Sequence, residues 1–309
     1  MKLIFMGTPD FAVGTLEALV QAGHEIVLAV TQPDKPQGRK QVLVAPPVKE
    51  KALELGIPVF QPKRVREPDS LRVLKDYEPE LIVVAAFGQI LPKELLDLPK
   101  YGCINVHASL LPKYRGAAPI QWSILNGDDV TGVTIMRMDV GLDTGDMIAK
   151  TEIKIAPEDT GGTLFDRLAE AGARLCVETI PSIVDGTAVY TPQDESAATK
   201  VGMIKKQDGL IDFSRSARAI ECQVRGLNPW PSAYTSLAGK TLKIWSAEVC
   251  GGGDLSDAGK VAFIKKDCFG IQTGDGILVC KEVQLEGKKR MSAGDFLRGN
   301  AVEVGTVLG

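Results

Sequence analysis

The sequence predicts an α/β protein in which a Rossmann-like, mostly parallel sheet is followed by a small antiparallel β-barrel domain. Apolar, β-rich runs alternate with helical stretches in the N-terminal third, an order typical of parallel sheets with right-handed crossovers. Short β-like runs separated by Gly-rich turns occupy the C-terminal third, as in small barrels. The length of 309 residues also exceeds the usual size of a single core. We therefore expect one large and one small domain.

The N-terminal alternation indicates where a functional site should lie. Strands buried on both faces form continuous apolar runs, and several of these segments have that character. Ligands of such sheets bind at the carboxyl ends of the strands, so we expect functional residues just after a strand. In chain order the predicted strands and helices are KLIFMG (2–7), DFAVGTLEALVQAG (10–23), EIVLAVT (25–31), VKEKALELG (48–56), IPVFQ (57–61), LRVLKD (71–76) and ELIVVAAF (80–87).

Two segments depart from the simplest nucleotide-binding pattern. Residues 7–10, GTPD, stand where a Gly-rich loop would open the first helix, but they lack the G-x-G-x-x-G spacing. The sequence therefore argues against dinucleotide binding. Residues 33–47 then interrupt the alternation with four prolines, a glycine and several basic residues. We expect a long exposed loop there, and long loops inside compact domains are often functional.

The domain division is expected at a polar, small-residue stretch. From about Val189 the sequence becomes TPQDESAATK, which is typical of a linker. We expect a catalytic domain over residues 1–189, a linker over 190–206 and a C-terminal domain over 207–309. Residues 200–309 carry a net charge of +4, whereas residues 1–199 carry −7. This asymmetry is compatible with contact to a nucleic-acid backbone and also with an ordinary solvated surface.

Composition excludes several classes of protein. No apolar stretch is long enough to span a membrane and the N-terminus lacks a secretory cleavage pattern, so we expect a cytoplasmic protein. The six cysteines form no C-x-x-C pair and have no histidine at zinc-finger spacing, which indicates buried free thiols and no metal site. Only His24 and His107 are available to a mechanism that needs an imidazole.

The densest group of reactive side chains is CINVHASLLPKYRGAAPIQW, residues 103–122, which follows a predicted strand. Asn105 and His107 are separated by one residue, so both side chains project from the same face of an extended chain. An amide beside an imidazole suits acyl transfer, because Asn105 can donate to an oxyanion while His107 handles protons. A buried, hydrogen-bonded structural role for His107 is an equally open interpretation.

A second polar cluster, MDVGLDTGD at residues 138–146, follows the β-like run GVTIMRM. The ligand spacing and the closing glutamate of an EF-hand are absent, which argues against a calcium loop. A carboxylate at this strand end can instead orient and charge-stabilise His107. By pattern alone, a solvated turn is as good an interpretation.

Several separate strings together carry a family resemblance. NVHASLLPKYRGAAPIQW, MDVGLDTGDM, FMGTPDFA, TQPDKPQGR (31–39) and VRGLNPWPSAYT (224–235) make the chain similar to the folate-dependent formyltransferases over essentially its whole length. The resemblance implies an enzyme with Asn105, His107 and Asp143 as its catalytic trio. It also implies 10-formyltetrahydrofolate as the formyl donor and no metal. The implied folate site comprises Ser109, Leu110, Leu111 and Pro112, with the backbone of Gly88, Gln89, Ile90 and Leu91 holding the pteridine.

The resemblance further implies a nucleic-acid partner. The acceptor would be the α-amine of initiator methionyl-tRNA, contacted by a basic loop with Lys35, Arg39 and Lys40 and by an OB-like C-terminal module. We expect a monomer that needs no membrane. Other interpretations remain open: a formyltransferase acting on a sugar amine or on glycinamide ribonucleotide, a non-catalytic module that binds folate or RNA, or a hydrolase that releases formate.

Overall fold

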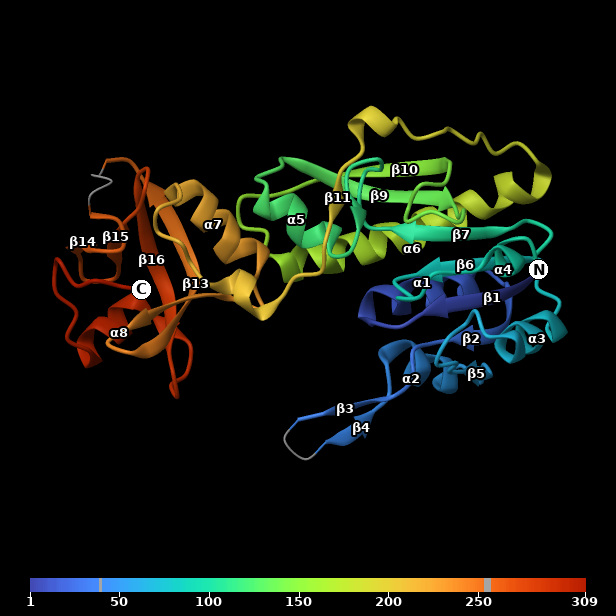
Figure 1. Cartoon of the computed structure of the whole chain (residues 1–309), viewed down its shortest axis with the longest axis horizontal. Helices are drawn as coiled ribbons and strands as arrows, with labels where there is room; N and C mark the ends of the chain where they lie inside the picture. The colour runs from blue at the N-terminus through green and yellow to red at the C-terminus, as the bar shows by residue number, and fades with distance from the viewer. Residues whose placement is uncertain (39–40, 253–256) are drawn as a thin grey trace. The chain divides into compact units, whose positions relative to one another are not determined.

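The computed structural model describes residues 1–38, 41–252 and 257–309, and its first compact unit is built on a seven-stranded sheet. The strand order is β10-β9-β7-β6-β1-β2-β5 (Figure 1). Neighbours from β5 to β7 are parallel, whereas β7 and β9 are antiparallel, which confirms the prediction of a mostly parallel sheet. The strands are β1 (Lys2–Gly7), β2 (Glu25–Val30), β5 (Val59–Phe60), β6 (Leu81–Ala85), β7 (Cys103–His107), β9 (Val130–Arg137) and β10 (Met147–Lys154).

Two helices, α1 and α6, pack against each other beside the sheet. The rings of Phe11 and Phe165 meet edge to face with centroids 5.6 Å apart. Gly172 of α6 lies so close to Val106 that an added Cβ would come within 2.8 Å of its Cγ1. This contact fixes which face of β7 is covered by α6. The helices of the parallel-sheet region are α1 (Asp10–Gln21), α2 (Pro47–Glu54), α3 (Pro68–Asp76), α4 (Lys93–Leu96) and α6 (Gly161–Asp185).

The segment expected to be a long loop contains a β-hairpin. Strands β3 (Lys35–Gln37) and β4 (Val42–Val44) pair antiparallel, with Lys35 opposite Val44, and α2 follows directly. The prediction of irregular structure was therefore wrong for these six residues. The cause is that VLV has high β-propensity, which the prolines around it masked in the sequence pattern. Val42 and Leu43 are 58% and 67% exposed, so the hairpin carries no alternation of buried and exposed positions.

The segment expected to be a linker is held by the first unit as far as Val201. Strand β11 (Lys200–Val201) pairs with β8 (Arg115–Gly116), and Thr191 exchanges two 2.9 Å backbone hydrogen bonds with Met147. A 3-10 helix, η1 (Glu195–Ala197), is capped by the side chain of Asp194. Polar composition therefore does not mark a free connector here, because its polar groups bond back to the fold.

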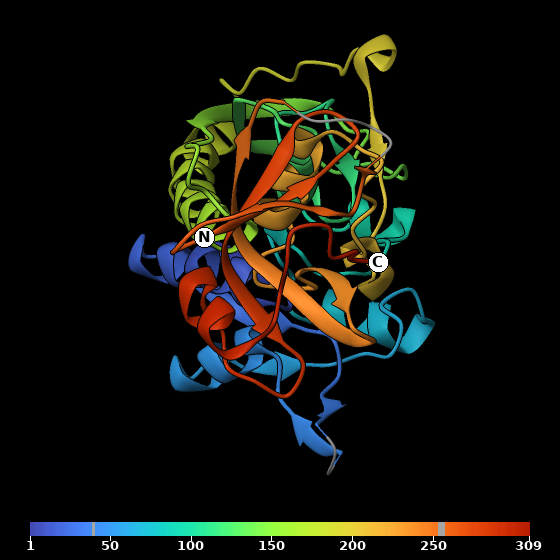
Figure 2. The same cartoon turned by 90° about the vertical axis from the view of Figure 1, so that its left-hand side faces the viewer.

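The second compact unit contains the antiparallel sheet predicted for the C-terminal region. Its order is β12-β13-β16-β15-β14, with β17 pairing β16, and the long strands β13 and β16 lie side by side in Figure 2. This unit also includes residues 120–130 and 155–164, so it is not confined to 207–309. Its elements are α5 (Pro119–Leu125), η2 (Lys206–Gly209), α7 (Ala217–Gly226), β12 (Ala233–Leu237), β13 (Lys240–Cys250), β14 (Val261–Ile264), β15 (Phe269–Gln272), β16 (Ile277–Leu285), β17 (Met291–Ser292) and α8 (Ala293–Gly299).

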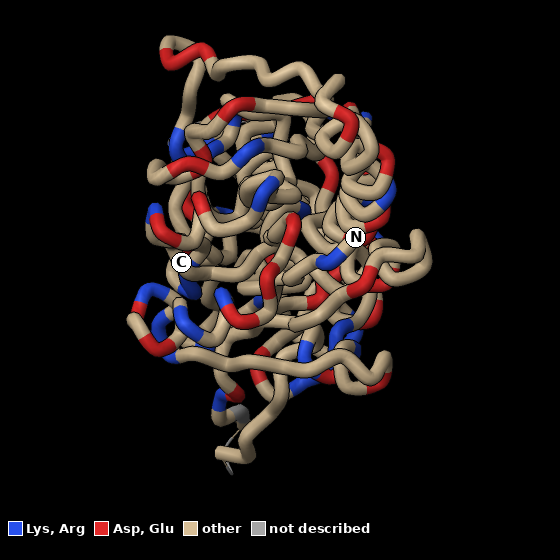
Figure 3. The backbone as a smooth tube through the Cα atoms, turned by 90° about the vertical axis from the view of Figure 1, so that its right-hand side faces the viewer, with Lys and Arg blue, Asp and Glu red and all other residues tan. Residues whose placement is uncertain are grey.

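Neither the distribution of charged residues nor the cysteines indicate a further functional site in the described residues. In the view of Figure 3, basic and acidic positions are interspersed along the backbone. All six cysteines are free and five are buried, and burial raises the pKa of the Cys103 thiol to about 12. Within the described ranges, no group of three or more potential metal ligands occurs. No helix in the same residues has the length and apolarity to cross a membrane.

Candidate active site

Because side chains alternate in direction along β7, Asn105 and His107 lie on the face of the sheet opposite α6. Val106 contacts α6 at Gly172, and neighbouring residues of a strand project to opposite faces. Asn105 is 9% exposed and His107 is 6% exposed, so both are largely shielded from water. The spacing argument therefore places the two side chains on one surface, as the sequence indicated.

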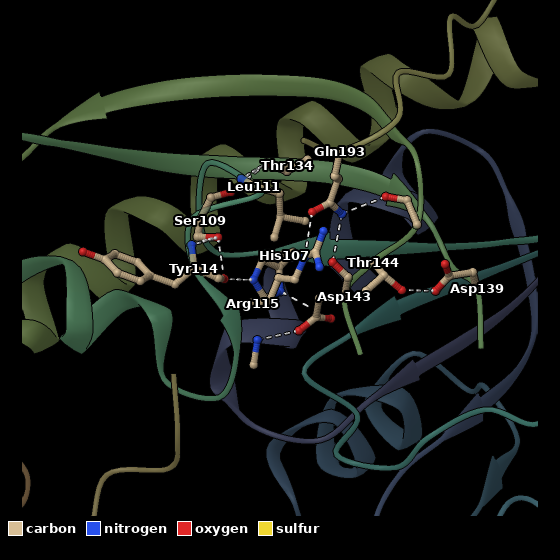
Figure 4. Close-up of polar contacts among 12 residues, drawn as sticks. His107, Ser109, Leu111, Tyr114, Arg115, Thr134, Asp139, Asp143, Thr144 and Gln193 are labelled. Carbon is tan, nitrogen blue, oxygen red and sulfur yellow. Dashed lines mark hydrogen bonds and ion pairs between the residues drawn. The ribbon is translucent and has the colours of Figure 1, made fainter. Parts of the chain in front are cut away.

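His107 is oriented by a backbone carbonyl. Its Nε2 lies 2.7 Å from the carbonyl oxygen of Tyr114. A carbonyl can only accept, so Nε2 donates and Nδ1 is the nitrogen that faces Asp143. Ser109 secures the loop that supplies this carbonyl, because its Oγ donates to Tyr114 O at 2.9 Å and accepts from Tyr114 N at 3.0 Å. Figure 4 shows the ring between Tyr114 and Asp143.

Asp143 completes the group from a loop after β9. Its Oδ1 lies 3.8 Å from His107 Nδ1, and its Oδ2 accepts from the backbone N–H of Gly116 at 2.8 Å. Asp143 has φ = +54°, in the left-handed region, where a residue other than glycine costs about 1 to 3 kcal/mol. The surrounding fold must therefore hold this conformation. The solvated-turn interpretation of residues 138–146 is not what the structure has at Asp143, whose side chain is 13% exposed.

The side-chain amide of Asn105 is available to bind a ligand group. Within the described parts of the chain its side chain makes no hydrogen bond, although it lies in a strand paired on both sides. The residue is 9% exposed, and neither of its amide atoms is among the fully buried side-chain atoms that lack a partner in the described residues, so the amide is accessible to an incoming ligand group. Asn105 can therefore donate to a carbonyl oxygen that reaches this face of the sheet.

The first predicted folate segment is closely held by the fold. Ser109 and Leu111 are buried, whereas Leu110 and Pro112 are partly exposed. Thr134, opposite His107 in the register, donates through Oγ1 to Ser109 O at 2.7 Å and accepts from Leu111 N at 3.1 Å. The Ser109 hydroxyl is used within the loop, where it bonds the backbone of Tyr114, and the Leu111 side chain packs in a hydrophobic cluster with Met136 and Met147.

The second predicted folate segment follows β6, the parallel neighbour of β7, and so lies at the same edge of the sheet as His107. Gln89 is engaged, because its Oε1 accepts from Val65 N at 2.7 Å and its Nε2 donates to Pro62 O at 3.3 Å. Leu91 is buried, whereas Gly88 is exposed and Ile90 is 73% exposed. The backbone at Gly88 and Ile90 is therefore the accessible part of this segment.

Of the residues predicted to contact nucleic acid, Lys35 is exposed on β3. Arg39 and Lys40 lie outside the described residues.

Three residues that form hydrogen bonds next to the site were not singled out from the sequence: Arg115, Gln193 and Glu195. The Arg115 side chain is 1% exposed and binds both carboxylate oxygens of Glu195, at 2.6 and 3.0 Å. This hydrogen bonding lowers the pKa of the Glu195 carboxyl. Arg115 Nε also donates to Gln193 Oε1 at 3.0 Å. No pattern in the sequence signals these contacts, because the partners are about 80 positions apart.

Comparison with known proteins defines the family. Residues 1–180 match the model described as "Formyl transferase", and residues 203–301 match "Formyl transferase, C-terminal domain". The chain belongs to the formyl transferase family. It is thus an enzyme of formyl transfer, which confirms the family resemblance seen in the sequence.

Curated relatives match this formyl transferase along its whole length. A methionyl-tRNA formyltransferase of Agathobacter rectalis is 59% identical, with 99% of each chain covered. The corresponding protein of Bacillus subtilis is 52% identical, over 100% of this chain and 98% of the relative.

Solved structures share the fold at lower identity. An N-formyltransferase from Helicobacter canadensis, solved with folinic acid and dTDP-3-aminofucose, has a TM-score of 0.68 at 20% identity and covers 94% of this formyl transferase and 100% of that chain. A methionyl-tRNA formyltransferase from Clostridium thermocellum has a TM-score of 0.52 at 18% identity, with 80% and 93% covered.

Proposed function

We propose that this formyl transferase moves the formyl group of 10-formyltetrahydrofolate to the α-amine of initiator methionyl-tRNA. The observation that carries the acceptor is full-length identity of 59% and 52% to relatives named methionyl-tRNA formyltransferase. The observation that carries the chemistry is the grouping of an uncommitted amide, an oriented imidazole and a carboxylate at one sheet edge. The product would be N-formylmethionyl-tRNA, made in the cytoplasm by a monomer.

The reaction is an acyl transfer between nitrogen atoms. The neutral amine attacks the formyl carbon, a C–N bond forms, and negative charge grows on the formyl oxygen. Asn105 donates to that oxygen, and a single oxyanion donor of this kind contributes about 3 to 4 kcal/mol. The tetrahedral intermediate then collapses, and the C–N bond to the folate nitrogen breaks.

His107 and Asp143 manage the proton in this scheme. Because Nε2 is held by the Tyr114 carbonyl, Nδ1 is the position that takes the proton from the attacking nitrogen and passes it to the departing one. The Asp143 carboxylate faces that position across 3.8 Å and compensates the transient positive charge on the ring. With Nδ1 protonated, His107 also donates to the formyl oxygen.

The substrates are expected to approach the accessible parts of the same edge. The folate pteridine would lie along the backbone of Gly88 and Ile90, beside Leu110 and Pro112. The tRNA would be contacted by Lys35 on the hairpin and by the basic residues Arg39 and Lys40. We assign residues 207–309 to an OB-like tRNA-binding domain and 1–189 to catalysis, with 190–206 between them.

The acceptor is tested by transfer of label from formyl-labelled 10-formyltetrahydrofolate. Charged initiator tRNA, charged elongator tRNA and a nucleotide-linked sugar amine serve as parallel acceptors. Label on initiator methionyl-tRNA with little on the other two supports the proposal. Label on the sugar amine alone, or release as formate without an acceptor, overturns the assigned acceptor while leaving the formyl chemistry intact.

A further inference from the structure

Asp143 is held in its left-handed conformation by a side chain from a distant segment. Gln193 Nε2 donates to the backbone carbonyl of Asp143 at 2.8 Å and to that of Gly145 at 2.8 Å. These two hydrogen bonds clamp the backbone on both sides of Thr144. The Asp143 carboxylate points instead toward His107 and Gly116, so it is not used to stabilise its own backbone (Figure 4).

The orientation of the Gln193 amide is determined by its partners. Arg115 offers only donors and the two carbonyls offer only acceptors, so only one of the two amide orientations satisfies all three contacts. Arg115 is itself fixed by burial and by the paired hydrogen bonds to Glu195. The next residue, Gly116, donates to the Asp143 carboxylate. Residues 115–116 therefore reach Asp143 twice, at its carboxylate directly and at its backbone through Gln193.

We propose that Gln193 is a positioning residue of formyl transfer, which holds the Asp143 backbone so that the carboxylate faces His107, and that Arg115 orients its amide. This inference rests on the proposed role of Asp143 in catalysis. Gln193 touches no reacting atom in this scheme and acts only through Asp143.

A double-mutant cycle separates positioning from a merely structural contribution. The variants are Gln193→Leu, Asp143→Asn and the two combined, with kcat, both KM values and the melting temperature measured for each. Gln193→Leu is expected to lower kcat about tenfold while each KM stays within about twofold, since a small displacement of a catalytic group slows the chemical step. In the Asp143→Asn background the same substitution is expected to lower kcat by less than about twofold. The carboxylate through which Gln193 acts is already absent there.

Two further variants control for side-chain volume and for the loss of any glutamine whose amide donates to backbone carbonyls. Gln193→Glu keeps the size and the acceptor for Arg115 but turns an oxygen toward two carbonyls, so it should lower kcat as much as Gln193→Leu. Gln272, 4% exposed in the second unit, also donates its amide to two backbone carbonyls, at 3.0 and 3.3 Å. Gln272→Leu should lower the melting temperature without lowering kcat.

The inference would be overturned if the fold-decrease in kcat of the double variant equalled the product of the decreases in Gln193→Leu and Asp143→Asn. It would also be overturned by wild-type activity in either Gln193 variant, wild-type activity in Asp143→Asn, or an equal loss of kcat in Gln272→Leu. The cycle is run on whichever amine the wild-type enzyme formylates. A failure to formylate initiator methionyl-tRNA would therefore overturn the acceptor assignment and leave the role of Gln193 to be decided by the cycle.

Discussion

The site has one half on a strand and one half on a loop, and the two are held in different ways. Asn105 and His107 lie in β7, between β6 and β9, so a backbone ladder on each side fixes them. Asp143 lies in a loop whose neighbours Val140 and Leu142 are 68% and 55% exposed, and it depends on side-chain hydrogen bonds. The strand-borne half should therefore tolerate loss of a functional group without moving, whereas the loop-borne half should move when its supports are removed.

The largest effect is expected for Asn105→Ala. The side chain makes no hydrogen bond within the described residues, so its removal should leave the fold intact and remove only the oxyanion donor. Turnover should fall about a hundredfold or more. Steady-state kinetics and the melting temperature are to be measured together. Near-normal turnover in a folded variant would show that Asn105 is not the donor.

Gly145→Ala tests the loop-borne half. A Cβ at Gly145 would lie 1.8 Å from the carbonyl oxygen of Arg137, so the loop must shift. We expect kcat to fall about tenfold or more and the melting temperature to fall as well. Gly14→Ala in α1 is the matched control, because its Cβ would meet only Ala173, at 4.0 Å, and alanine favours the helix. Unaltered kcat in Gly145→Ala would contradict the need for a fixed loop.

Lys35→Ala tests the binding of charged tRNA. Lys35 belongs neither to the strand-borne half nor to the loop-borne half of the site. Removal of one phosphate contact should raise KM for charged tRNA a few-fold, reduce the slope of log affinity against log salt by about 1, and leave kcat unchanged. Lys75→Ala, at an exposed lysine of α3, is the control. An equal change in both variants, or a change in kcat, would argue against a tRNA contact at the hairpin.

The smallest effect is expected for Glu195→Gln. The Glu195 side chain is 73% exposed and the glutamine keeps an oxygen that accepts from Arg115, so kcat should stay within about twofold. Turnover at low and high salt is the measurement. A tenfold loss would mean that the exposed end of the network, rather than the Gln193 amide, holds the loop.

Local patterns in the sequence predicted the strand-borne half. Period-two spacing placed Asn105 and His107 on one face, and alternation of strands and helices predicted the parallel sheet at whose carboxyl edge they lie. Asp143 was identified only through the family resemblance, and its left-handed backbone conformation was not predicted. Asn105 and His107 could be predicted because their spacing along β7 depends only on residues that are neighbours in the sequence.

The supports of the loop-borne half could not be predicted in the same way. Gln193 and Glu195 sit in a polar stretch with the composition of a linker, and their partners are 48 to 80 positions away. Composition reports whether a segment is solvated on average. It does not report which buried arginine or carbonyl a particular amide meets. The pairing of β3 with β4 was missed for a related reason, because proline content outweighed a three-residue β-forming run.

The most direct test of the site is the vibrational frequency of the formyl carbonyl in bound 10-formyltetrahydrofolate, isolated by isotope editing in the absence of an acceptor. If Asn105 donates to the formyl oxygen, the carbonyl stretch should shift to lower frequency on binding to the wild-type enzyme, and most of that shift should be lost in Asn105→Ala at equal occupancy. An identical frequency in the two proteins, with the donor bound to both, would contradict the account.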